Sequence, residues 1–170
     1  MNIFDTGEIA AAADERSTLE AFLDYYREAV KRKVGAVSEE DARRRLVPSA
    51  TTLGGLIKHL RRVELSWFQH RLAQIPREEL PPLQWIEDDP DGDFRVEPDE
   101  TGKSLIAEYD AQCALSREVA ARFQLTDVVP HPHLGEVSLR WIYVHMIEET
   151  ARHAGHADIL REQIDGTLGD

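Results

Sequence analysis

The chain is poor in cysteine, with Cys113 as the one cysteine among 170 residues. An intramolecular disulfide is therefore excluded, and no set of thiolates is available for a zinc site. Because Cys113 falls within an apolar helical pattern and has no obvious base beside it, we expect a small core residue and not a nucleophile. Such sparse use of cysteine is typical of a reducing compartment.

Long apolar runs are also missing. No stretch approaches the length that a membrane-spanning helix needs. The first residues, Met1 to Glu8, lack the positively charged start and the apolar run of a signal peptide. These features predict a cytoplasmic protein without a membrane partner.

Basic residues are too few to balance the acidic ones. Lys and Arg number 20 against 32 Asp and Glu, which gives a net charge of -12. This charge is unfavourable for binding a nucleic acid backbone, and we expect the short run at residues 43–45 to be solvated. The length predicts one domain over residues 1–170, and a hydrophobic fraction of 42% suits a globular protein.

Hydrophobic residues recur at helical spacing in four long segments. We predict helices over residues 15–36, from 49–52 to about 75, over 101–123, and from 139 to about 164, with a short helical turn after Ser38. No alternating strand pattern is present, and residues 128–135 are predicted to be a loop. The pattern therefore predicts an all-α, single-domain four-helix bundle.

The connection over residues 76–98 is acidic and irregular, and it holds five of the eight prolines. We interpret it as a solvated loop, with a lid or a site wall as the alternative. Trp85 and Phe94 indicate that part of it packs down. Gly54 and Gly55, inside the second helix, would allow a close helix–helix approach or leave room at a site.

The last helix carries polar groups where its apolar face should continue. Leu139, Ile142 and Met146 define that face, and the same spacing then reaches Glu149 and His153. Residues four apart point the same way along a helix. Burying a carboxylate and an imidazole without partners is costly. We therefore predict that a bound divalent metal accounts for the pair.

A third ligand is available on the second helix, where His59 lies among apolar residues. Taken alone, a histidine in this setting is more often a core or boundary residue. Together, His59, Glu149 and His153 make a plausible site for zinc, nickel, iron or manganese. The His-Glu-x-x-His motif of zinc proteases is absent, which excludes that class.

His145 and His156 compete for a place at this site, as a fourth ligand, as donors that orient a ligand or move a proton, or as surface residues. We favour the last two roles. Glu64 is near His59 and could orient its ring, but we expect a solvated carboxylate. Other polar residues are predicted to lie beside the site or at the surface: Glu148, Arg152, His70, His131 and His133.

Two blocks of sequence resemble a known family. Leu53-Gly-Gly-Leu-Ile-Lys-His-Leu60, with Val63-Glu64 and Trp67-Phe68 after it, resembles the second helix of the DinB-like proteins. Residues 138–162, with Asp165-Gly166, resemble their last helix, and residues 14–16 fit the start of the first. The resemblance is closest to an actinobacterial branch grouped with mycothiol-dependent enzymes, and it is weak over residues 76–137.

The resemblance implies a four-helix bundle in up-down-down-up order, often a homodimer, with a metal held by one residue of the second helix and two of the fourth. Many members use three histidines. Here His59, Glu149 and His153 match the ligand pattern of the mycothiol-dependent maleylpyruvate isomerase. The chain does not include the C-terminal domain of that isomerase, so its thiol and substrate contacts are not carried over.

These features lead to three hypotheses. The first is a metal-dependent thiol S-transferase, in which mycothiol or a similar thiol binds zinc as thiolate and attacks an electrophile. The second is a hydrolase or isomerase that uses metal-bound water. The third is a structural metal in a binding or stress-response protein without turnover, which a closed site completed by His145 or His156 would favour.

Overall fold

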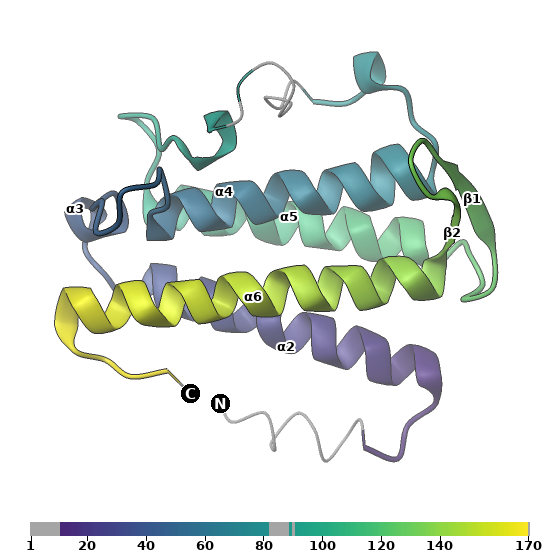
Figure 1. The fold of residues 1–170 in the computed structure, drawn as a ribbon, viewed down its shortest axis with the longest axis horizontal. Coiled ribbons are helices and arrows are strands. Elements are labelled where there is room, and N and C mark those ends of the chain that lie inside the picture. The colour runs from purple at the N-terminus through teal and green to yellow at the C-terminus, as the bar shows by residue number, and fades with distance from the viewer. Residues whose placement is uncertain (1–10, 82–88, 90, 170) are drawn as a thin grey trace.

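The structure, a computed structural model, describes residues 11–81, 89 and 91–169. These residues are mostly helical, as predicted, and four long helices lie side by side (Figure 1). The helices are α2 (Glu15–Gly35), α4 (Leu53–Glu64), α5 (Gly102–Ala120) and α6 (Leu139–Asp165). The expected helical turn after Ser38 is α3 (Glu39–Ala42).

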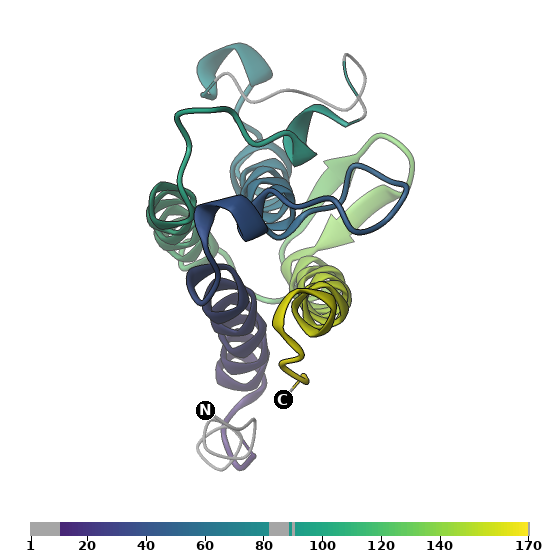
Figure 2. The same cartoon turned by 90° about the vertical axis from the view of Figure 1, so that its left-hand side faces the viewer.

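The four long helices surround a common interior, which Figure 2 shows almost along their axes. In Figure 1, α4 and α5 run in one direction, and α2 and α6 run in the other. α2 packs mainly against α6, and α4 against α5. The interior is filled by two apolar clusters, one around Leu56 and Tyr109 and the other around Phe68 and Met146.

Capping side chains fix where the helices begin. An oxygen of each capping side chain accepts a hydrogen bond from a backbone N–H of the first turn, which would otherwise lack a partner. The caps are Asp14 for α2, Thr52 for α4, Thr101 for α5 and Ser138 for α6. Gly166 ends α6 in the left-handed conformation, with a φ of 75°.

The second long helix departs from its prediction after Glu64. Residues Leu65–Leu72 form a π-helix, η1, and the helix ends at Leu72 and not near Ile75. Such π-helical turns are rare in proteins, and those that occur often lie at functional sites. Within η1, Trp67 contacts Trp141 of α6, with ring centroids 5.3 Å apart.

The predicted loop at residues 128–135 is wrong, as is the expectation that the chain has no strand. β1 (Val128–His131) and β2 (Gly135–Ser138) pair in an antiparallel hairpin, with Val129 opposite Val137. Both strands of a two-stranded sheet are edges, so Pro130 can lie in β1 without removing a hydrogen bond from an inner strand. The hairpin joins the end of α5 to the start of α6 (Figure 1).

The connection between η1 and α5 is irregular, as expected, and part of it lies on α4. Its described helical turns are η2 (Arg77–Glu79) and η3 (Gly92–Phe94), and Trp85 lies outside the described residues. A Cβ atom at Gly55 would come within 2.5 Å of the carbonyl oxygen of Phe94. Gly55 therefore admits this loop against α4. A Cβ atom at Gly54 would come within 3.2 Å of the carbonyl oxygen of Ala42 in α3, so Gly54 allows a close helix approach.

Glu64 is fully buried, so the expectation of a solvated carboxylate is wrong. Its two oxygens accept hydrogen bonds from Nε and Nη2 of Arg27, both at 2.7 Å. Arg27 lies on α2, and the spacing of residues on α4 gives no sign of this partner. The paired geometry offsets the cost of burying either charge alone.

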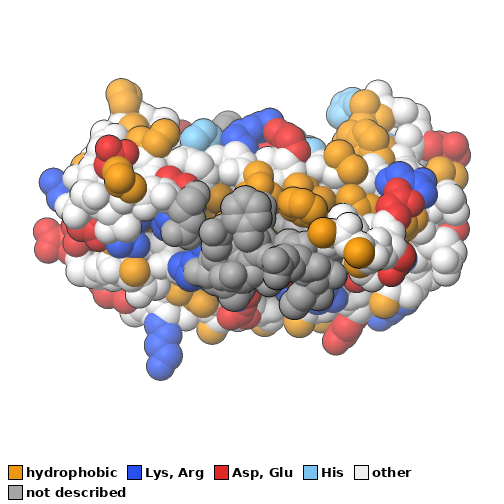
Figure 3. All heavy atoms as spheres, turned by 90° about the horizontal axis from the view of Figure 1, so that it is seen from below, with side chains coloured by type: hydrophobic (Ala, Val, Ile, Leu, Met, Phe, Trp, Pro, Cys, Tyr) orange, Lys and Arg blue, Asp and Glu red, His pale blue; other side chains and the backbone are white. Residues whose placement is uncertain are grey.

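Every helix in the described part of the chain is too short or too polar to span a bilayer. Acidic, basic and apolar side chains are interspersed over the face shown in Figure 3. The described residues of that face therefore form no continuous basic surface.

Candidate metal centre

Three polar side chains meet between α4 and α6. His59 comes from α4, and Glu149 and His153 come from α6, four residues apart. Oε1 of Glu149 lies 3.2 Å from Nε2 of His59 and 3.2 Å from Nε2 of His153. One ligand atom from each of the three lies within 4.8 Å of the others. We refer to these residues as the His–Glu–His cluster.

The cluster is largely shielded from solvent. His59 is 8% exposed and His153 is 9% exposed. Hydrogen bonds with His153 and His59 outweigh the effect of burial and hold the pKa of Glu149 far below its usual range. An ionised carboxylate between two imidazole nitrogens is a donor set that divalent cations favour, so the chemistry of the cluster fits a metal.

Asp93, which the sequence analysis did not single out, contacts the far side of the His59 ring. Nδ1 of His59 lies 2.8 Å from Oδ2 of Asp93, and Nε of Arg62 donates to the same oxygen. Burial acts to raise the pKa of Asp93, but the hydrogen bonds with His59 and Arg62 lower it overall. An ionised Asp93 only accepts, so Nδ1 of His59 carries a ring hydrogen. The ionised Glu149 likewise accepts from Nε2 of His59, and a metal held by the cluster would take the place of the hydrogen on Nε2.

Phe94 fixes the plane of the same imidazole ring. Its ring stacks on His59 with centroids 4.7 Å apart and an angle of 15°. Both contacts to His59 therefore come from η3, which reaches α4 because Gly55 has no side chain. No periodic pattern marks Asp93 in the sequence. The signal that was available is the aromatic ring of Phe94 directly after Asp93 in an otherwise polar segment.

His145 and His156, the two histidines that could assist the cluster, have different surroundings. Nδ1 of His156 lies 3.3 Å from Nδ1 of His153, so His156 contacts the ring nitrogen of His153 that does not face Glu149. His145 stacks on Trp141, with centroids 5.3 Å apart, and meets the ring of Trp67 at 4.6 Å. Among the described residues, the group that could hold a metal contains neither histidine.

Arg152 binds the outer side of the cluster. Its Nη1 donates to Oε2 of Glu149 at 3.2 Å, and its Nη2 donates to Glu148. The second oxygen of Glu149 is thereby held away from the two histidines. Arg152 is exposed, which agrees with the prediction that it lies beside the inward face of the last helix.

The remaining candidates lie apart from the cluster. His133 is exposed, as expected, whereas His131 is half-buried and stacks on Trp67 at 5.5 Å. His70 is also half-buried, and its Nδ1 lies 2.8 Å from the carbonyl oxygen of Ile75. Cys113 is buried in the core, as predicted, and burial raises its thiol pKa to about 12.

The fold and the cluster define a class, namely a mostly helical protein with a His–Glu–His donor set between two of its helices. The sequence matches the mycothiol-S-transferase family over residues 18–166. The chain therefore belongs to that family, a DinB-like branch, which confirms the resemblance drawn from the sequence.

A protein of known structure is similar in fold. It is described as a conserved protein from Enterococcus faecalis and is 18% identical, over 92% of this chain and 100% of that chain, with a TM-score of 0.66. At this level of identity the similarity shows the fold alone. A comparison with curated proteins finds no match.

Proposed function

We propose that the protein is a metal-dependent thiol S-transferase, which joins mycothiol or a related low-molecular-weight thiol to an electrophile. The family supports a thiol and a transfer reaction. The observation that carries the proposal is the convergence of His59, Glu149 and His153 in a chain of this family.

The cluster would hold a divalent cation. Zinc is the first candidate, and nickel, iron and manganese accept the same donors. A cation with three protein ligands supplies an open coordination position and lowers the pKa of a thiol placed there. The described residues offer no fourth ligand from His145 or His156, which supports an open site over a closed structural one.

The surrounding residues position the donors. Asp93 and Phe94 hold the ring of His59, and Arg152 holds Oε2 of Glu149. His156 touches His153, so we assign it the task of orienting that ring. We assign His145 to packing against the two tryptophans.

Two hollows beside these residues offer room for reactants. One, of about 380 Å³, is lined by Phe94 and by Arg43, Arg45 and Arg95. The other, of about 300 Å³, is lined by His156 and by the apolar side chains of Ile159 and Leu160. Each hollow includes one residue that contacts the cluster, Phe94 in the first and His156 in the second, so a polar and an apolar reactant would both find room near it.

We further infer that residues 1–170 form one domain, a four-helix bundle in up-down-down-up order. The directions of α2, α4, α5 and α6 support this order. The family resemblance supports a homodimer, and the single buried cysteine suits the cytoplasm.

The test is a thiol-conjugation assay on protein loaded with zinc. Consumption of mycothiol is followed with a panel of electrophiles, and bound metal is measured in the same samples. His153→Ala should lose both metal and conjugation. His133→Ala removes an exposed histidine outside the cluster and should retain both.

Equal rates of conjugation by His153→Ala and by the unchanged protein would refute the proposal. Metal binding without conjugation would favour the two alternatives. Turnover of an ester or a keto acid without any thiol would then indicate a hydrolase or isomerase, and no turnover would indicate a non-catalytic metal protein.

A further inference from the structure

The hollow beside Phe94 contains three arginine side chains, Arg43, Arg45 and Arg95, and we refer to it as the arginine hollow. Its volume of about 380 Å³ lies in the range of sites for small molecules. Asp91 is the one carboxylate among its lining residues. The hollow thus holds three cations and one anion, although the chain as a whole carries a net charge of -12. An excess of positive charge is therefore concentrated at this place.

Arg43 brings a positive charge that forms no ion pair among the described residues. The run at residues 43–45 is solvated only at Arg44 and Arg45, and Arg43 is half-buried. Its two terminal nitrogens donate to backbone carbonyl oxygens of residues 96–100. Carbonyl groups satisfy the hydrogen bonds of a guanidinium group but bring no formal charge. An anion near Arg43 would therefore offset part of the cost of keeping this charge away from water.

Arg45 is held in place by backbone carbonyl groups in the same way. Its Nε donates to the carbonyl oxygen of Ser49 at 2.7 Å, and its Nη2 donates to that of Pro48. Its Nη1 has no hydrogen-bond partner within the described part of the chain, so both hydrogens of this nitrogen are available to a ligand. A guanidinium group that is already fixed loses less side-chain entropy when it binds a carboxylate or phosphate oxygen.

Arg95 does have a carboxylate partner, and the pair is exposed. Its Nη1 donates to Oδ2 of Asp89 at 3.1 Å, and the two side chains are 54% and 36% exposed. Exposed ion pairs of this kind contribute little to stability. The Nε and Nη2 atoms of Arg95 bind no other described residue, so they can donate to a ligand while the pair with Asp89 stays intact.

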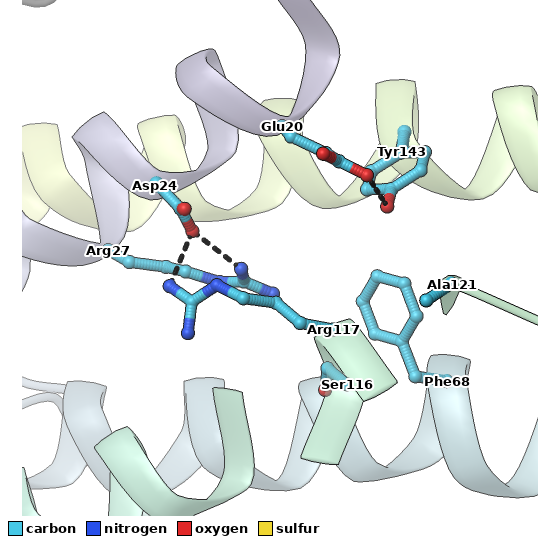
Figure 4. Close-up of a pocket in the computed structure, with 8 residues that line it drawn as sticks. All are labelled: Glu20, Asp24, Arg27, Phe68, Ser116, Arg117, Ala121 and Tyr143. Carbon is cyan, nitrogen blue, oxygen red and sulfur yellow. Dashed lines mark hydrogen bonds and ion pairs between the residues drawn. The ribbon is translucent and has the colours of Figure 1, made fainter. Parts of the chain in front are cut away.

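A second pocket, lined in part by α2 and α5, shows the contrast (Figure 4). It also contains two arginines, but Arg27 and Arg117 both donate to Oδ1 of Asp24, at 2.8 Å and 2.7 Å. The positive charges of that pocket are therefore balanced by the protein itself. Arg43 and Arg45 have no such carboxylate, so the arginine hollow is the place where an anion from solution would supply the missing charge.

The start of α4 lies at the same hollow. Ala50 and Thr52 line the hollow, and α4 begins directly afterwards at Leu53. The first turn of a helix carries a partial positive charge, because its N–H groups point along the axis without intrahelical partners. This charge adds to that of the arginines, and both favour a negatively charged ligand over a neutral one.

We propose that the arginine hollow binds a small oxyanion, namely a carboxylate or a phosphate group. Its oxygens accept from Nη1 of Arg45 and from Arg95, while Arg43 and the start of α4 supply positive potential. Phe94 offers an apolar surface to the remainder of an organic anion. The hollow shares no residue with the His–Glu–His cluster, so the proposal is independent of the metal and of the thiol reaction.

The first test uses the unchanged protein and three probes in calorimetric titrations at constant ionic strength. Propionate and inorganic phosphate represent the two kinds of oxyanion, and the one that binds more tightly identifies which of them the hollow prefers. Propionamide has the shape of propionate without its charge and should bind at least about tenfold more weakly. The proposal is overturned if neither anion binds, or if propionamide binds as tightly as propionate.

The second test locates the site. Arg45→Gln should weaken binding of the preferred anion at least about tenfold, and because Arg45 is exposed the variant should fold normally. Arg44→Gln is the matched control, since Arg44 is the exposed neighbour that pairs with Asp41 and does not line the hollow. Its affinity for the anion should stay within about twofold of the unchanged protein.

Two results of this comparison would refute the assignment. Equal weakening by Arg44→Gln and Arg45→Gln would mean a general attraction to the basic run and no defined site. Unchanged binding by Arg45→Gln would mean that the anion binds elsewhere, for example on a metal at the His–Glu–His cluster.

Discussion

Cys113 illustrates how burial sets the chemistry of a single residue. Its thiol pKa is raised from an ordinary 9.0 to about 12, first by burial and then by the charge of Glu64. Below about pH 9 the thiol is neutral in both the folded and the unfolded chain. Above that pH the unfolded chain loses the proton while the folded chain keeps it, so the free energy of unfolding falls until about pH 12.

We therefore predict an alkaline loss of stability of up to about 1.4 kcal/mol per pH unit from this one group. Urea unfolding between pH 8 and pH 11 measures it. Cys113→Ala should be less stable at pH 8 because it leaves a cavity, yet its stability should fall less steeply with pH. Parallel slopes for the two proteins would contradict the assignment.

Asp93 acts on the cluster through His59. Asp93→Asn removes the charge that holds the ring hydrogen on Nδ1, and outer partners of this kind typically contribute a factor of 10–100 in metal affinity. We expect a loss of about that size for zinc, measured by competition with a chromogenic chelator. Asp91→Asn changes an exposed neighbour of the same turn and should keep the affinity. Equal affinities would show that Asp93 has no such role.

Among the elements, those encoded by local signals could be predicted and those that depend on distant contacts could not. Thr52 and Ser138 cap their helices through bonds within one turn, and the apolar spacing is equally local. The hairpin is an exception, because it is local and was still not predicted: Pro130 and Pro132 break the alternating pattern that identifies a strand. The burial of Glu64 depends on Arg27 from another helix.

The approach of η3 to α4 gives a prediction at the same scale. A methyl group at Gly55 would meet the backbone of Phe94, which cannot move aside like a side chain. We expect Gly55→Ala to destabilise the protein by about 1–3 kcal/mol and to weaken zinc binding, since Asp93 shifts with η3. Urea unfolding and a zinc titration measure the two effects.

Gly155→Ala is the matched control for this substitution. Nothing lies within 4 Å of a Cβ atom at Gly155, which is in the interior of α6. Alanine should there stabilise the protein by about 0.5–1 kcal/mol. If both variants change stability alike, the close contact at Gly55 does not constrain the fold.

Over the whole molecule, the part of the candidate site on regular helices could be predicted. Glu149 and His153 interrupt an apolar face, and His59 does the same on another helix, so packing the two faces brings them together. Asp93 could not be predicted, because its position depends on how a 3-10 turn lies on α4. The supporting residues of a helical site thus come from the least regular part of this chain.

A cation held between α4 and α6 should stabilise the entire fold, because the unfolded chain does not hold the three donors together. At a free zinc concentration of 100 times the dissociation constant, the gain is about 2.7 kcal/mol. For a chain of this size that corresponds to a rise in Tm of about 5–11 °C. Thermal unfolding with zinc and with a chelator measures the difference. His153→Ala should abolish the shift and His133→Ala should retain it. An equal shift in both variants would mean that zinc binds outside the His–Glu–His cluster.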